Sequence, residues 1–343
     1  MRLTCASAHV SALRIPLTVV LVAVLVAGCH VPGTGASGGV SGSRSITVAF
    51  VPAIDNAPLS VAAKDGLFQQ HGLNVTVKSY PSLDAEFAAL TSGQAQIAVG
   101  DYTDFLYEQS LYETQSTGHF SLRLIADAYD AAPNSVAILT LPGSGITTPQ
   151  QLQGQSGGVA TPLAQVAPYS PAVPYNVQTL AAEEVLQNDG VSPSSVEWAP
   201  TPAQDMIGEL RSGQVKAILV TEPYIIEAEQ LGAVEVVDAT SGVTSGLPMS
   251  GYFSLSSYAS ANPSAVQAFQ AALDQAQSDC AQRGPVQAVL PDLTGMSTDN
   301  SALVTLGTYP ISLNVGQVQR VASLMYDSGM INLPVSVNAM TSG

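Results

Sequence analysis

Two ten-residue segments of this chain repeat one another at an offset of 120 residues, and this repeat is the strongest constraint on the fold. Leu90–Val99 (LTSGQAQIAV) and Leu210–Leu219 (LRSGQVKAIL) share Leu, Ser, Gly and Gln at matching positions. Each segment has the pattern of a helix end, a glycine suited to a left-handed cap and a short apolar strand. The alternative is chance use of a common helix-to-strand turn. Otherwise the repeat predicts two similar α/β lobes, each with a loop at the carboxyl end of a strand, where open α/β sheets bind ligands.

The chain around the first copy alternates between strand and helix patterns. Strands are predicted at Ile46–Val51, Leu73–Tyr80 and Ile97–Gly100, with helices at Leu59–Gln70 and Leu83–Thr91 between them. This alternation favours an α/β body built on mainly parallel sheets. A length of 343 residues allows about two domains. The formal charge of −16 removes the electrostatic attraction on which nucleic-acid binding depends, so no nucleic-acid partner is expected.

The N-terminal residues have the pattern of a targeting segment. Arg2 and Arg14 precede the apolar run Ile15–Ala27, which has the length of a signal-peptide core. The sequence LVAGC, ending at Cys29, resembles a bacterial lipobox, which predicts a signal peptide at residues 1–28 and a lipid on Cys29. The alternative is an uncleaved anchor, or an ordinary secretory signal with a chance cysteine.

Residues 29–45 are rich in Gly and Ser and predict a flexible tether. Gly33, Gly35 and Gly38 match the G-x-G-x-x-G spacing, but the strand and helix that a dinucleotide site requires do not flank them. No cofactor and no metal site are therefore expected. Cys280 lies in a predicted helix with no nearby base, so we expect a small buried side chain.

Five segments together resemble a known family. They are ITVAFVPAIDNAPLSVAAKDGLFQQHGLNVTV, ALTSGQAQIAVGDYTDFLY, ITTPQQLQGQSGGVA, ELRSGQVKAILVTEPYIIEAEQLG and ANPSAVQAFQAALDQA. In order and spacing they resemble the SsuA-type solute-binding proteins of ABC importers. That family takes up sulfonates, taurine, nitrate and thiamine pyrimidine precursors.

The resemblance implies a type II periplasmic-binding fold, with two α/β lobes and a ligand cleft between them. One lobe would combine residues 46–140 with 252–343, and the other would span 141–251, with crossings near 136–141 and 251–255. It further implies hinge closure on a small molecule, delivery to an ABC permease with its ATPase, an extracytoplasmic location held by the lipid alone, and a monomer.

Candidate ligand contacts lie in the loops that would face this cleft. They are Asp55 and Asn56 after the first strand, Asp101, Tyr102 and Thr103 after the third, and Thr161, Tyr169, Tyr175, Thr221, Glu222 and Tyr224 in the second lobe. Acids could accept hydrogen bonds from an amine or amide, and tyrosines could stack on a ring. Alternatively, Asp101 and Glu222 only cap the helices that follow them, and the two tyrosines of the long 161–176 loop pack beneath it.

No Lys or Arg falls in these loops, which favours a neutral or cationic ligand over a small anion. Catalysis is not expected, because the chain carries no H-E-x-x-H, Walker or G-x-S-x-G motif. The enzyme alternative is a pyrimidine synthase of the same fold, which would use a histidine and a cysteine-rich iron site. A third reading is a surface lipoprotein that senses a ligand without transport.

Overall fold

A computed structural model describes residues 44–115, 118–163 and 176–342. The predicted signal peptide, the lipid site at Cys29, and Tyr169 and Tyr175 lie outside these residues. Residues 42–343 form one compact unit. The first strand begins at Arg44, so the last two residues of the predicted tether already pair in a sheet.

The fold contains two five-stranded sheets, and each sheet with its helices forms one lobe. In the first lobe the strand order is β2-β1-β3-β10-β4. Its strands are β1 (Arg44–Phe50), β2 (Leu73–Ser79), β3 (Ile97–Asp101), β4 (Leu122–Asp130) and β10 (Pro248–Leu255). In the second lobe the order is β7-β6-β8-β5-β9. Its strands are β5 (Val136–Thr140), β6 (Val159–Pro162), β7 (Trp198–Thr201), β8 (Ala217–Thr221) and β9 (Val234–Asp238).

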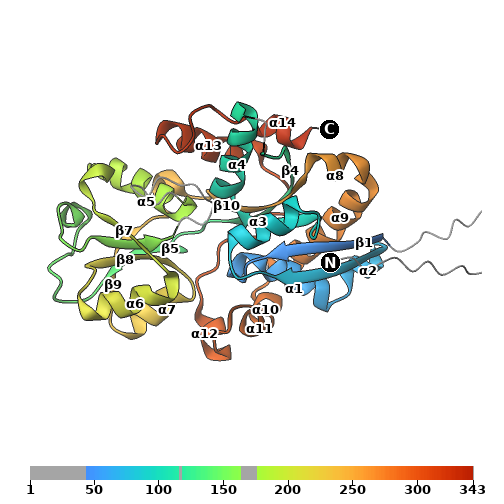
Figure 1. Cartoon of the computed structure of the whole chain (residues 1–343). Helices are drawn as coiled ribbons and strands as arrows, with labels where there is room; N and C mark the ends of the chain where they lie inside the picture. The colour runs from blue at the N-terminus through green and yellow to red at the C-terminus, as the bar shows by residue number, and fades with distance from the viewer. Residues whose placement is uncertain (1–43, 116–117, 164–175, 343) are drawn as a thin grey trace, which may run out of the picture. The chain divides into compact units, whose positions relative to one another are not determined.

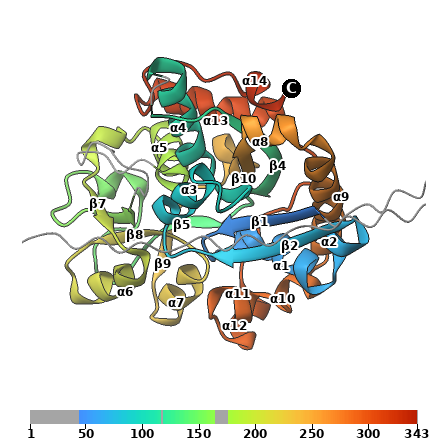
Figure 2. The ribbon, with the colours of Figure 1, turned by 45° about the vertical axis from the view of Figure 1, so that its right-hand side comes forward.

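Helices cover both sheets (Figures 1 and 2). In the first lobe they are η1 (Ile54–Asn56), α1 (Ala57–Lys64), α2 (Leu67–Gln70), α3 (Leu83–Thr91), α4 (Tyr102–Gln115), α8 (Ser256–Ala261), α9 (Pro263–Cys280), α10 (Arg283–Gln287), α11 (Leu290–Thr294), α12 (Thr298–Leu303), α13 (Val315–Asp327) and α14 (Val337–Thr341). In the second lobe they are η2 (Pro149–Leu152), α5 (Val177–Asn188), η3 (Pro193–Ser195), α6 (Ala203–Ser212), α7 (Tyr224–Gln230) and η4 (Gly242–Thr244). Helix α5 lies on one face of the second sheet, and α6 and α7 lie on the other.

Each sheet is mixed: four of its strands run in one direction, in line with the mainly parallel sheets that the sequence predicts, and one strand runs in the reverse direction. Strands β2, β1 and β3 pair in parallel, as do β7, β6 and β8. Strand β10 is antiparallel to both its neighbours, and so is β5. These two strands each follow a crossing from the other lobe, at residues 131–135 and 239–247, and they enter their sheet in the reverse direction. The crossings therefore lie upstream of the expected positions. Strand β5, expected in the first lobe, belongs to the second sheet, and β10, which the expected boundary divides, belongs wholly to the first sheet.

The repeated segments occupy equivalent places in the two sheets. Each one ends a helix (α3 or α6) and leads into the strand at the centre of its sheet (β3 or β8). Gly93 and Gly213 make both turns at positive φ, 77° and 74°. The two sheets also correspond in strand order once their antiparallel strands, β10 and β5, are matched to each other, so the repeat marks a structural correspondence and not a chance turn.

The predicted helix Leu59–Gln70 is two helices. It breaks at Gly66, which has a φ of 69° and starts α2 in a new direction. Within the described residues, no helix combines the length and apolar character needed to cross a membrane.

Candidate functional site

A cavity of about 220 Å³ lies between the two lobes, at the carboxyl ends of β3, β6 and β8. The first lobe lines it with Asp55, Asn56, Leu83, Gly100, Asp101 and Asp104, among others. The second lobe contributes Pro162, Leu163, Asn176, Gln178, Met206, Thr221 and Tyr224. A smaller cavity of about 90 Å³ shares Asp55, Asp101, Gln178 and Thr221 and adds Tyr129 and Glu222. Strand ends from both lobes thus meet at one site, as the position of ligands in α/β sheets predicts.

The structure brings five of the predicted contacts to the larger cavity: Asp55, Asn56, Asp101, Thr221 and Tyr224. Tyr102, Thr103 and Thr161 are fully buried and are not among its lining residues. The Tyr102 hydroxyl donates to Asp127, and the Thr161 hydroxyl lies 2.5 Å from that of Thr179. These three side chains belong to the core of their own lobes.

Glu222 takes the capping role that the sequence left open. Its Oε2 accepts the backbone N–H of Ile226 in α7 at 3.2 Å, and its Oε1 accepts that of Thr305 at 2.9 Å. Glu222 therefore fixes the start of α7 and joins the second lobe to the segment after α12. It borders only the smaller cavity.

The cavity residues that the sequence analysis missed include Asp104 and Gln178. Asp104 lies in the first turn of α4, three positions after Asp101, the last residue of β3. Gln178 is the second residue of α5, and its Nε2 donates across the cavity to Oδ2 of Asp101 at 3.3 Å. The closeness of Asp104 to Asp101 in the sequence could have revealed Asp104, but nothing in the sequence signals Gln178.

Burial dominates the electrostatics of the site. It raises the pKa of Asp101 from 3.8 to about 7, with a further rise from the nearby Asp55 carboxyl and a partial offset from Gln178. Burial also raises the pKa of Asp55 and raises that of Asp104 well above its ordinary value. Behind them, burial raises the pKa of Glu86, which accepts the backbone N–H of Val99 at 2.8 Å. The carboxyl groups of such a site keep their protons to a higher pH than exposed ones, unless a positively charged group lies beside them.

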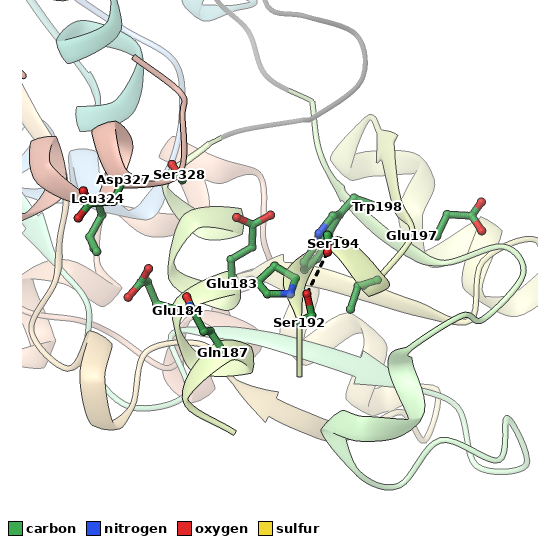
Figure 3. A pocket seen from close by; sticks show the side chains of 12 residues that line it. Glu183, Glu184, Gln187, Ser192, Ser194, Glu197, Trp198, Leu324, Asp327 and Ser328 are labelled. Atoms are coloured by element: carbon green, nitrogen blue, oxygen red, sulfur yellow. Dashed lines mark hydrogen bonds between the residues drawn. The ribbon is translucent and has the colours of Figure 1, made fainter. Parts of the chain in front are cut away.

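A larger cavity of about 840 Å³ lies elsewhere, between α5, the start of β7 and the end of α13 (Figure 3). Glu183 and Glu184 project from α5 beside Asp327 of α13. This groove lies at the amino end of β7, opposite to the strand ends that bind ligands in such folds. Several of its polar side chains, including Gln187, Glu197 and Asp327, are exposed. We therefore place the candidate site in the smaller cavity at the carboxyl ends of β3, β6 and β8.

The described residues contain no group of three or more His, Cys, Asp and Glu side chains arranged to hold a metal ion. Cys280 is buried, and burial raises its pKa to about 12. It is not among the residues that line either inter-lobe cavity.

A sequence model of the NMT1-like family matches residues 40–289, which is most of the chain. The chain belongs to the NMT1-like family. The matched range includes both sheets and every described residue that lines the inter-lobe cavity.

Relatives of this NMT1-like chain include the nitrate import ATP-binding protein NrtC of Synechococcus elongatus. The two are 25% identical over 212 residues, which is 61% of this chain and 31% of NrtC. The chain thus spans about a third of the length of that curated relative.

Two solved structures establish the two-lobed fold. The periplasmic aliphatic sulphonate binding protein SsuA from Escherichia coli has a TM-score of 0.68 and 16% identity, covering 87% of this chain and 97% of SsuA. The desulfurization enzyme DSZB has a TM-score of 0.63 and 18% identity, covering 87% of this chain and 96% of DSZB. The same fold therefore serves a binding protein and an enzyme.

Proposed function

We propose that this protein is an extracytoplasmic solute-binding protein of an ABC importer. The observation that carries the proposal is the inter-lobe cavity, which draws its lining from the strand ends of both lobes. Membership of the NMT1-like family and the relationship to the nitrate import protein NrtC and to SsuA support it. The ligand is a small molecule, and the partners are a permease and its ATPase.

Capture works by hinge closure. The two crossings, 131–135 and 239–247, are the chain segments about which the lobes turn. A ligand that contacts Asp55 and Asp101 on one lobe and Thr221 and Tyr224 on the other stabilises the closed form relative to the open one. Tyr169 and Tyr175 remain predicted contacts.

The N-terminal segment supports the extracytoplasmic part of the proposal. We assign residues 1–28 to a signal peptide and Cys29 to the site of a lipid anchor. We also expect the protein to be a monomer. The intact mass of the mature protein tests this assignment, because loss of residues 1–28 and gain of a diacylglycerol group change it in a defined way.

We propose binding and not catalysis, although DSZB shares the fold. A cysteine nucleophile needs a lowered pKa and access to substrate, and Cys280 has a raised pKa and a buried position away from the cavity. A sensing role without transport would use the same cavity. Permease and ATPase genes next to the gene of this protein would favour import over sensing.

A thermal-shift screen of the full chain tests the binding role. The panel contains sulfonates, taurine, nitrate, thiamine precursors, nucleobases and amines. A ligand present at 100 times its dissociation constant adds about 2.7 kcal/mol to the free energy of unfolding, which raises the melting temperature visibly. We expect at least one class to do so, with small-angle scattering showing a more compact protein. If the protein is folded and no ligand class raises its melting temperature or makes it more compact in scattering, the proposal is contradicted.

A further inference from the structure

Carboxyl groups supply all the ionisable side chains around the inter-lobe cavity apart from tyrosine. Asp55, Asp101 and Asp104 line it from the first lobe, and Glu222 borders the adjoining small cavity. Neither set of described lining residues includes Lys, Arg or His. Residues 164–175 contain no basic residue in the sequence either. The site therefore contains several carboxyl groups and, among its described lining residues, no side-chain cation to pair with them.

Oxygen atoms in this cavity lack partners. Asp104 is only 4% exposed, and its Oδ1 makes no hydrogen bond within the described chain. The same holds for Oδ1 of Asp55 and Oε1 of Gln178, which are also shielded from solvent. A buried acceptor without a donor is costly, and native proteins rarely keep one without a reason. Three such acceptors, two on the first lobe and one on the second, are left for hydrogen-bond donors of a ligand.

The two side-chain amides that reach the cavity from the second lobe are already used inside the protein. Gln178 Nε2 donates to Asp101, and the Asn176 side-chain amide donates to the carbonyl of Pro162 at 2.6 Å. A sulfonate or nitrate would meet carboxyl oxygens here, and it would have to overcome their repulsion with no basic side chain to help.

The remaining wall is apolar and aromatic. Leu83, Met206 and Leu219 line the cavity beside the half-buried ring of Tyr224. An organic body can pack against these groups, and a tyrosine ring attracts a neighbouring cation.

We propose that the ligand of this cavity is a small organic cation that donates N–H hydrogen bonds, of the protonated amine or amidine class, held by Asp55, Asp101 and Asp104. This inference rests on the proposed solute-binding function and names its ligand class.

A matched series of ring compounds tests the charge directly. Benzylamine and benzamidine carry a cation, benzyl alcohol is neutral, and benzenesulfonate is an anion of similar size. Titration of the full chain followed by ligand-observed NMR should show the two cations binding about tenfold or more tighter than the alcohol, and no binding of the sulfonate. Calcium is added as a competitor and should not displace them.

Variants locate the binding. Asp104→Asn keeps the shape and removes the charge, and it should weaken benzamidine about tenfold or more. Asp101→Asn is the second variant, in case the first does not fold. Asp65→Asn is the matched control, because Asp65 is an exposed residue at the end of α1 outside both cavities; its affinity should equal that of the unmodified chain.

The pH dependence of ligand affinity distinguishes a cationic ligand from an anionic or a neutral one. The titratable groups that face Asp101 are themselves acids or tyrosines: Asp55 of η1, Glu86 of α3, Asp104 of α4, Tyr129 of β4 and Glu222 after β8. Benzamidine should therefore bind more tightly as the pH rises from about 5 to about 8, because these carboxyl groups lose their protons.

Several results overturn the proposal. Sulfonate binding equal to that of the amines does so while leaving the solute-binding function intact. Displacement of the amines by calcium, or equal weakening by Asp65→Asn and Asp104→Asn, also overturns it. If none of the ring compounds binds, the cation class is rejected, and the broader thermal-shift panel then decides the solute-binding function separately.

Discussion

Individual side chains around the site divide between cavity and core according to the first turn of α4. Asp101 and Asp104 line the cavity, whereas Tyr102 and Thr103, between them in sequence, are fully buried. Asp101 is the last residue of β3 and α4 begins at Tyr102. Successive helical residues point about 100° apart, so Asp104 points to a different side of α4 from Tyr102 and Thr103. The tendency of α/β sheets to bind ligands at the carboxyl ends of their strands predicted this loop. Only the start of α4 at Tyr102, however, determines which of its side chains reach the cavity.

Tyr102 is a test of that division. Its hydroxyl donates to Asp127, whose other oxygen accepts the backbone N–H of Asn314 at 2.8 Å. Tyr102→Phe leaves the Asp127 oxygen buried without its donor, so we expect a loss of about 1–3 kcal/mol in the free energy of unfolding, measured by urea titration. Ligand affinity should stay unchanged.

The exposed Tyr326 supplies the control, since Tyr326→Phe removes a hydroxyl that water can reach. If Tyr102→Phe weakened ligand binding tenfold and left stability unchanged, Tyr102 would be a ligand contact, as the sequence alone suggested.

Helix α5 shows how one element positions the second-lobe side of the cavity. Asn176 precedes it, accepts the backbone N–H of Thr179 through Oδ1 at 2.7 Å, and donates to the carbonyl of Pro162 at the end of β6. One side chain thus caps α5 and joins it to the strand beside it. Gln178, two residues later, is placed by this cap to reach Asp101.

Replacing this cap has a predictable cost. Asn176→Ala removes the acceptor for Thr179 and the donor to Pro162, and we expect a loss of about 1–2 kcal/mol in unfolding free energy, measured by urea titration. Asn176→Ser restores the acceptor alone and should recover part of the loss. Equal stability of the Ala variant and the unmodified chain would show that the helix start does not depend on this residue.

At the level of elements, the sequence predicted the strand and helix alternation but not strand direction. Apolar runs such as Val136–Thr140 and Pro248–Leu255 are buried on both faces whichever way they run, so their composition does not distinguish parallel from antiparallel pairing. Direction follows from which lobe the chain comes from, a long-range property that no local pattern records. The break at Gly66 was missed because the apolar spacing continues through it.

The whole molecule is short of positive charge. Among the described residues the one ion pair within 4 Å joins His119 to Glu108 at 3.4 Å. Every aspartate and glutamate with a resolved shift has its pKa raised, with burial as the largest cause; the values for Asp101, Asp130 and Glu183 reach about 7. Buried acids without cationic partners hold their protons longer in the folded protein than in the unfolded chain.

This gives stability a definite pH dependence. Between about pH 4 and 7 the unfolded chain releases protons that the native carboxyl groups still hold, so the free energy of unfolding falls as the pH rises through this window and levels off above it. Urea titrations at about pH 5, 6 and 7 should show a steady decline in the free energy of unfolding, with a smaller further change at about pH 8.

Replacing the carboxyl groups with raised pKa values should make the free energy of unfolding depend less on pH. We expect Asp101→Asn, Asp130→Asn and Glu183→Gln together to be less sensitive to pH than the unmodified chain. A rise in stability between pH 5 and 8 would contradict the raised pKa values.

The placement of β10 in the middle of the first sheet determines the order in which the lobes can be completed as the chain emerges. Strand β10 lies between β3 and β4, and its residues, 248–255, follow the whole of the second lobe. Until they arrive, β4 has no neighbour to join it to β1, β2 and β3. The strands of the second lobe run from Val136 to Asp238 without interruption, so a chain that emerges from its N-terminal end can close that lobe first. The first lobe, which begins the sequence, is finished last.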